Sequence, residues 1–180
     1  MLILAADCGV TGAQLAVLNL GQQLLAHTSM PIDRRKPSVV ISRALADRLV
    51  AMVDELGMSS VRRRCVMSVP GVVDRERGTV LDPSSLGPWH GTALADEMRQ
   101  LLDAPVHLEN DAKLRALGEA RSATAMHGPL VYVKAGSGIG LGLVSAGGHI
   151  EHGSDGAAGE ISHIRVPGSS ALVDAATSAA

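Results

Sequence analysis

Three short apolar runs open the chain before any helical pattern begins, and this order restricts the fold more than any other feature. The runs cover residues 2–6, 13–18 and 23–29, with turns around Gly9 and Gly21 between them. Short apolar runs joined by glycine-containing turns predict an antiparallel meander. An opening of this kind is unlike a purely doubly wound parallel sheet and indicates a mixed α/β fold.

Helical and extended patterns alternate after the meander. Apolar side chains recur at helical spacing from Ile41 to Leu56, with Ser38 as the expected N-cap and Gly57 as the expected C-terminal stop. Further helices are predicted at 92–102 and 110–125, and further strands at 64–69, 105–109 and on both sides of Gly78. A glycine-rich hairpin follows from residue 130, and we expect it to lack a helix that covers it. The predicted boundary between two lobes lies near residues 120–129, dividing residues 1–125 from 126–180.

The composition indicates a globular protein that does not bind nucleic acid through bulk charge. Hydrophobic residues make up 46% and charged residues 19% of the 180 residues, and the formal net charge is −2. Trp89 and Tyr132 are the only aromatic residues of the Phe, Trp and Tyr class. A sugar site in this chain must therefore depend on hydrogen bonds rather than on stacking.

Cysteine content and hydropathy bear on location. Cys8 and Cys65 do not make a disulfide framework, and no apolar stretch reaches the roughly 20 residues that a membrane span needs. The first residues lack the basic segment of a signal peptide and lead directly into Asp7. We expect a cytoplasmic protein without a membrane partner.

Two glycine-rich turns could hold a nucleotide. In the first, Asp7-Cys8-Gly9-Val10-Thr11-Gly12, an acidic residue precedes glycine and a hydroxyl, which can hold a Mg-nucleotide. Taken alone, this pattern is more often an ordinary glycine hairpin, because Asp-x-Gly is common. In the second, residues 136–142, backbone N–H groups could cradle phosphate, or the glycines could serve close strand packing. No helix follows as in a Rossmann fingerprint, and no Gly-Lys-Ser/Thr ends it as in a Walker A loop.

Two polar clusters could bind a sugar. Asn110 and Asp111 stand at a predicted strand-to-helix junction, where they could hydrogen-bond sugar hydroxyls or simply cap the helix. Asp111 could also act as general base toward a hydroxyl that attacks a γ-phosphate. Glu160 and His163 are three residues apart and would share a face in a helix or tight turn. His163 could instead ligate a metal, but it lacks partners at local spacing.

Taken together in this order and spacing, these motifs resemble the ROK family of repressors and sugar kinases. The resemblance covers about residues 2–167. It includes the Asp-x-Gly-x-Thr opening, Val69-Pro70-Gly71-Val72-Val73-Asp74, Leu86-Gly87-Pro88-Trp89, Pro105 to Ala112, Val131 to Gly142, and Ala158 to His163.

The resemblance implies an actin-like (ribonuclease H-like) ATPase lobe with a mixed sheet, followed by an incomplete second lobe, with a sugar bound between the lobes. It matches Asp111 to the catalytic base, and Asn110, Asp111, Glu160 and His163 to sugar-binding positions. It matches the phosphate loops to Asp7, Gly9, Thr11, Gly136, Ser137 and Gly138. His163 also matches a zinc ligand of the family, but the cysteine-rich loop that should follow is missing, so we do not expect zinc.

The departures from the family favour a regulator over a kinase. Family kinases usually have Gly and then Lys where this chain has Val10 and Gly12, and Tyr132-Val133-Lys134 is more typical of the regulators. Our first hypothesis is the sugar-sensing domain of a transcriptional regulator that contacts DNA only through a domain absent from this chain. The second is an ATP- and Mg-dependent hexose kinase of the glucokinase type, and the third is a non-functional fragment. We expect a truncated or reduced family member that forms a homo-oligomer.

Overall fold

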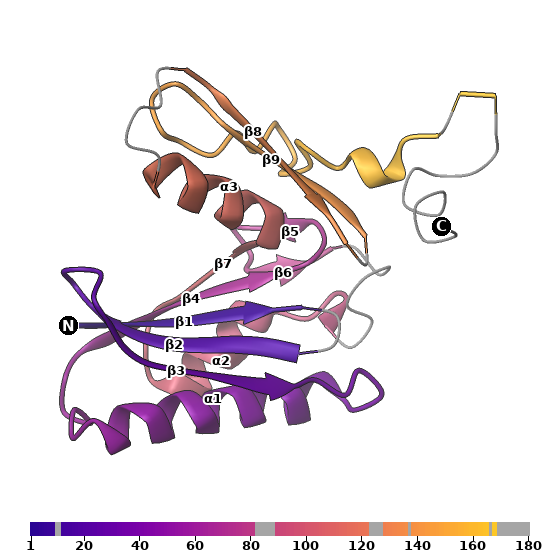
Figure 1. The fold of residues 1–180 in the computed structure, drawn as a ribbon. Coiled ribbons are helices and arrows are strands. Elements are labelled where there is room, and N and C mark those ends of the chain that lie inside the picture. Colours follow the sequence, from indigo (N-terminus) through magenta and orange to yellow (C-terminus); the bar gives the residue numbers. More distant parts are fainter. Residues whose placement is uncertain (10–11, 82–88, 123–127, 137, 166, 169–180) are drawn as a thin grey trace. The chain divides into compact units, whose positions relative to one another are not determined.

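The computed structural model describes residues 1–9, 12–81, 89–122, 128–136, 138–165 and 167–168 (Figure 1). The chain divides into two compact units, Met1–Glu109 and Asn110–Ala180, and each unit is described by itself below. The lobe boundary near residue 125 follows from sequence pattern alone, and it stays a prediction.

A five-stranded mixed sheet forms the centre of the first unit. Strands β1 (Leu2–Cys8), β2 (Gly12–Asn19) and β3 (Leu24–Pro31) are antiparallel neighbours, so the predicted meander is confirmed. Strand β4 (Arg63–Val69) lies parallel to β1, and β7 (Val106–Asn110) completes the order β3-β2-β1-β4-β7.

Two helices pack on one side of this sheet (Figure 1). Helix α1 (Ser38–Glu55) buries the apolar residues that the helical spacing predicted except Leu56, which is its half-buried C-cap, and α2 (Leu94–Leu102) buries Leu94, Met98 and Leu102. Gly57 has a φ of 68° just beyond α1, which confirms it as the C-terminal stop. The predicted N-cap was wrong, because Pro37 occupies that position and no side chain caps the helix.

The short strands around Gly78 are present as predicted. They are β5 (Val73–Asp74) and β6 (Thr79–Val80), paired antiparallel. Gly78 has a φ of 63°, and a Cβ there would lie 2.4 Å from Ala95 Cβ of α2, so both conformation and space require glycine. Nearby, the indole N–H of the fully buried Trp89 donates to Ser42 Oγ of α1 at 3.1 Å.

The second unit is a helix packed on a hairpin. Helix α3 (Asp111–Ser122) covers one face of β8 (Leu130–Ala135) and β9 (Ile139–Val144), and a short 3-10 helix follows at Ile161–His163. The expectation of an uncovered hairpin was therefore wrong, because the covering helix precedes the hairpin in the sequence. Side chains on the other face remain in contact with solvent: Val131 is 61% and Val133 57% exposed.

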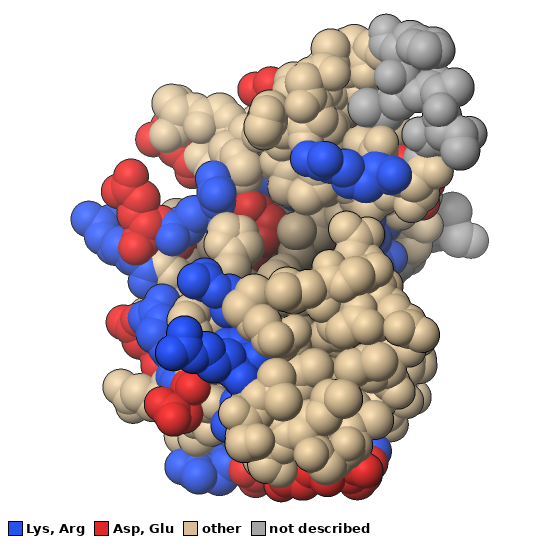
Figure 2. Space-filling model, turned by 90° about the vertical axis from the view of Figure 1, so that its left-hand side faces the viewer, with Lys and Arg blue, Asp and Glu red and all other residues tan. Residues whose placement is uncertain are grey.

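Charged residues of both signs are interspersed on the face of the molecule in Figure 2. Ion pairs among the described residues include Arg48 with Glu55 at 2.7 Å and Arg75 with Glu109 at 3.2 Å.

Within the described residues, no helix is both long and apolar enough to cross a membrane.

Candidate functional site

Asn110 and Asp111 lie where β7 passes directly into α3. Asn110 Oδ1 accepts from the backbone N–H of Lys113 at 3.0 Å, so Asn110 is the side-chain cap of the helix. Asn110 and Asp111 are 5% and 4% exposed. The capping interpretation is thus correct for Asn110, whereas the carboxylate of Asp111 is held by other contacts.

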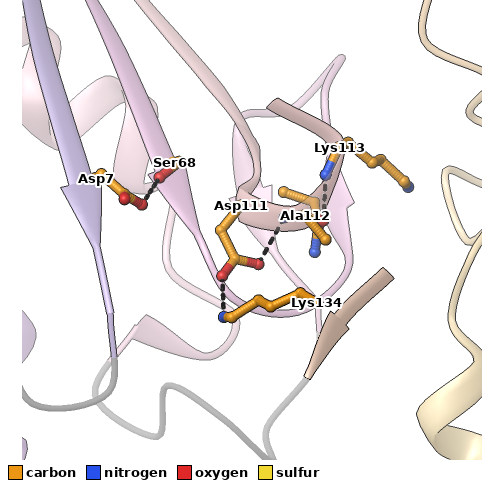
Figure 3. A network of polar contacts seen from close by, with 7 residues as sticks. Asp7, Ser68, Asp111, Ala112, Lys113 and Lys134 are labelled. Atoms are coloured by element: carbon orange, nitrogen blue, oxygen red, sulfur yellow. Dashed lines mark hydrogen bonds and ion pairs between the residues drawn. The ribbon is translucent and has the colours of Figure 1, made fainter. Parts of the chain in front are cut away.

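Both oxygens of the Asp111 carboxylate accept hydrogen bonds. Oδ1 accepts from the N–H of Ala112 at 2.8 Å, and Oδ2 contacts Lys134 Nζ at 2.5 Å (Figure 3). Lys134 projects from β8 on the face that α3 covers, because burial alternates along that strand. Sequence reasoning did not select Lys134 as a site residue, although the same alternation in residues 130–134 would have placed it toward α3.

The second glycine-rich segment combines an open turn with a packing surface. The N–H of Gly136 donates to the carbonyl of Gly138 at 3.2 Å, and a Cβ on Gly136 would meet nothing within 4 Å. By contrast, a Cβ on Gly142 would lie 2.5 Å from the carbonyl oxygen of Ala112. Close packing therefore explains why residue 142 is glycine. Phosphate binding by the turn at Gly136 and Gly138 stays a prediction, and Ser137 lies outside the described residues.

Glu160 lies in a segment that two contacts join to the rest of this unit. The nearly fully buried Lys113 donates from Nζ to the carbonyl of Gly156. Gly159 has a φ of 92°, and a Cβ there would lie 2.2 Å from the carbonyl oxygen of Leu141. Glu160, half-buried, precedes the 3-10 helix that contains His163, whose side chain lies outside the described part.

The candidate nucleotide residues Asp7 and Gly9 belong to the first unit. Asp7 Oδ1 accepts from the hydroxyl of Ser68 on β4 at 2.5 Å (Figure 3). The N–H of Gly9 donates to the carbonyl of Gly12 at 2.8 Å. Thr11 and Val10 lie outside the described residues. A Cβ on Gly12 would lie 3.0 Å from the carbonyl oxygen of Met30 on β3, so packing of the meander favours glycine there.

Cys8, next to Asp7, is not a nucleophile. Burial raises the pKa of its thiol far above the ordinary value, and the neighbouring charge of Asp7 and the proximity of Cys65 add to the effect. A thiol that stays protonated is a poor nucleophile and metal ligand. Among the described residues, no three His, Cys, Asp or Glu side chains come together in a group that could hold a metal ion.

The sequence pattern that describes the ROK family matches residues 3–176 of this chain. The chain belongs to the ROK family. Known structures of ROK sugar kinases and regulators are similar to it, and they have the actin-like ATPase fold, so the predicted fold class is confirmed. One is a ROK glucokinase from Streptomyces griseus in complex with glucose and AMPPNP. It has a TM-score of 0.71 and 27% identity, covering 92% of this chain and 51% of that one.

Both kinases and repressors occur among the curated relatives. The chain is 28% identical over 169 residues to a glucokinase of Halalkalibacterium halodurans, covering 89% of this chain and 48% of that protein. It is 31% identical over 99 residues to the xylose repressor of Bacillus subtilis, covering 54% of this chain and 25% of the repressor. The chain thus spans about half or less of these ROK proteins, and family membership does not choose between the two functions.

Proposed function

We propose that this chain is the sugar-binding, effector-sensing domain of a ROK-family transcriptional regulator. The observation that carries the proposal is Gly12. Family kinases usually have a lysine at this position, whereas here a Cβ would lie 3.0 Å from the Met30 carbonyl oxygen. The first turn therefore supplies no ammonium group for the phosphates of a nucleotide.

In this function, the polar groups of the second unit bind the hydroxyls of a sugar. Asp111 and Asn110 are fixed by hydrogen bonds from backbone N–H groups. Glu160 is half-buried and lies shortly after Gly156, whose carbonyl accepts a hydrogen bond from Lys113. His163 completes the set by its match to the family. Groups fixed in advance lose little conformational entropy on binding a ligand. DNA binding would come from a domain outside this chain, and we place the protein in the cytoplasm as a homo-oligomer.

A second candidate is an ATP-dependent hexose kinase, favoured by the retained Asp111. The sugar hydroxyl would attack the γ-phosphate of ATP, forming the new P–O bond while ADP leaves, and Asp111 would take the hydroxyl proton. Asp7 supplies carboxylate oxygens, the ligand type that Mg²⁺ prefers, and the amides near Gly136 and Gly138 could contact phosphate. ATP would supply the transferred group.

Sugar binding and phosphoryl transfer, measured side by side, separate the two functions. Hexoses and amino sugars are titrated calorimetrically into this chain and into a longer protein that contains it, and transfer from Mg-ATP is assayed with the same panel. Sugar binding without turnover is the expected result. The Asp111→Asn variant should bind the sugar measurably more weakly, whereas Asp155→Asn, at an exposed aspartate of the same unit, should not. Turnover that Asp111→Asn abolishes would establish the kinase instead.

A further inference from the structure

Lysine is rare in this chain, and two of the three lysines lie around the start of α3. Lys36 is exposed, whereas Lys113 is 1% exposed and the side chain of Lys134 is 24% exposed. Arginine supplies all the other formal positive charges among the 16 Lys and Arg residues. Lysine is a compact point charge with three donors, which suits a single carboxylate oxygen approached from one side.

The packing of the hairpin on α3 guides the Lys134 side chain to Asp111. Lys134 pairs with Gly140 across the hairpin, and a Cβ on Gly140 would lie 3.8 Å from both Cβ and Cδ of Lys134. The same Cβ would lie 2.9 Å from Ala112 Cβ, so glycine at 140 keeps β9 and α3 close together. The Lys134 side chain therefore runs beside the helix start and brings Nζ to 2.5 Å from Asp111 Oδ2.

This contact changes what the Asp111 carboxylate can do. The side chain of Asp111 is 6% exposed, and its two oxygens face two donors, the Ala112 N–H and the Lys134 ammonium. A carboxylate has about four lone-pair sites, so with two of them occupied the carboxylate can still accept a hydrogen bond from a ligand hydroxyl.

We propose that Lys134 is the positioning residue of Asp111, holding its carboxylate as a fixed acceptor for a sugar hydroxyl. This inference rests on the proposed sensor function and deepens it. The ligand class is a neutral sugar with neighbouring hydroxyls. One of these hydroxyls donates to Asp111.

A double-mutant cycle on sugar affinity tests the coupling. Calorimetry compares the wild type, Lys134→Met, Asp111→Asn and the double variant, with Lys36→Met as a control at an exposed lysine. We expect Lys134→Met to weaken binding about tenfold, since it removes a charge-assisted hydrogen bond, and Lys36→Met to leave it within about twofold. In the Asp111→Asn background, Lys134→Met should have little further effect. An equal loss in both backgrounds would overturn the proposal.

A measurement without sugar keeps the two proposals separate. The ammonium ¹⁵N resonance of Lys134 should be protected from proton exchange in the wild type and lose that protection in Asp111→Asn, while the Lys113 resonance stays unchanged. An unchanged Lys134 signal would refute the positioning role whatever the ligand. If the signal responds but no sugar binds to this chain or to the longer protein, the sensor function fails and the Lys134–Asp111 pairing stands.

Discussion

Replacing Gly142 by alanine should loosen the second unit selectively. The added Cβ would lie 2.5 Å from the carbonyl oxygen of Ala112 and 2.5 Å from the Cβ of Ala116, both in α3. Carbon atoms at their optimal separation are about 3.5–4.0 Å apart, so α3 and β9 must move apart locally by about 1 Å. Overpacking of this kind costs about 1–3 kcal/mol.

Hydrogen exchange of peptides from both units measures this loss. Where exchange proceeds by unfolding of the unit, 1–3 kcal/mol corresponds to roughly 5- to 150-fold faster exchange in α3 and the hairpin. Exchange in β1, β2 and α1 should not change. Gly136→Ala is the matched control, because a Cβ there meets nothing within 4 Å in the same hairpin. If the two variants exchange at the same rate, the close packing of Gly142 on α3 is refuted.

Three further predictions concern stability. Ser42→Ala leaves the buried indole N–H of Trp89 without its acceptor and should lower the free energy of unfolding by about 1–3 kcal/mol, measured by urea titration with Trp89 fluorescence. Gly118→Ala, in α3 with nothing within 4 Å of the new Cβ, should stabilise the second unit by about 0.5–1 kcal/mol in hydrogen exchange. Burial raises the pKa of Cys65 to about 12. The contribution of the Cys65 thiol to the free energy of unfolding is therefore complete below the ordinary thiol pKa. Above that pKa the free energy of unfolding falls by up to about 1.4 kcal/mol per pH unit, because the thiol ionises only in the unfolded chain. Urea titrations from about pH 8 to 11 measure the free energy of unfolding across the range in which thiols ionise. This free energy should decline less steeply with pH in Cys65→Ala than in the wild type, and equal slopes would contradict the raised pKa of Cys65.

Local signals in the sequence were sufficient where a residue and its neighbours decide the structure. The meander follows from apolar runs and turns, and Gly57 and Gly78 both have positive φ at a helix end and a tight turn. Local signals misled where two residues competed for one position. Pro37, with φ −56° and ψ 148°, takes the N-cap position expected for Ser38, because a proline before a helix supplies an extended residue without any side-chain bond.

Contacts between distant segments could not be predicted from spacing alone. A covering helix was sought after residue 130, whereas α3 precedes the hairpin and packs on it through small residues. The sequence did carry a signal for this pairing, since Ala112 and Ala116 are four apart on one helix face and Gly140 and Gly142 alternate on one strand face. Two small-residue stripes of matching period allow a helix and a strand to approach closely.

The same close approach explains why Lys134 was missed as a site residue. The glycines of residues 136–142 were compatible with either phosphate binding or close packing, and the structure requires Gly140 and Gly142 for packing that brings Lys134 to Asp111. One neighbour on another strand can therefore fix the orientation of a carboxylate whose motif resembles that of a catalytic base. For ROK proteins with glycine at the position of Gly12 and lysine at that of Lys134, we expect sugar binding without phosphoryl transfer. A protein that has both residues and phosphorylates its sugar would refute this rule.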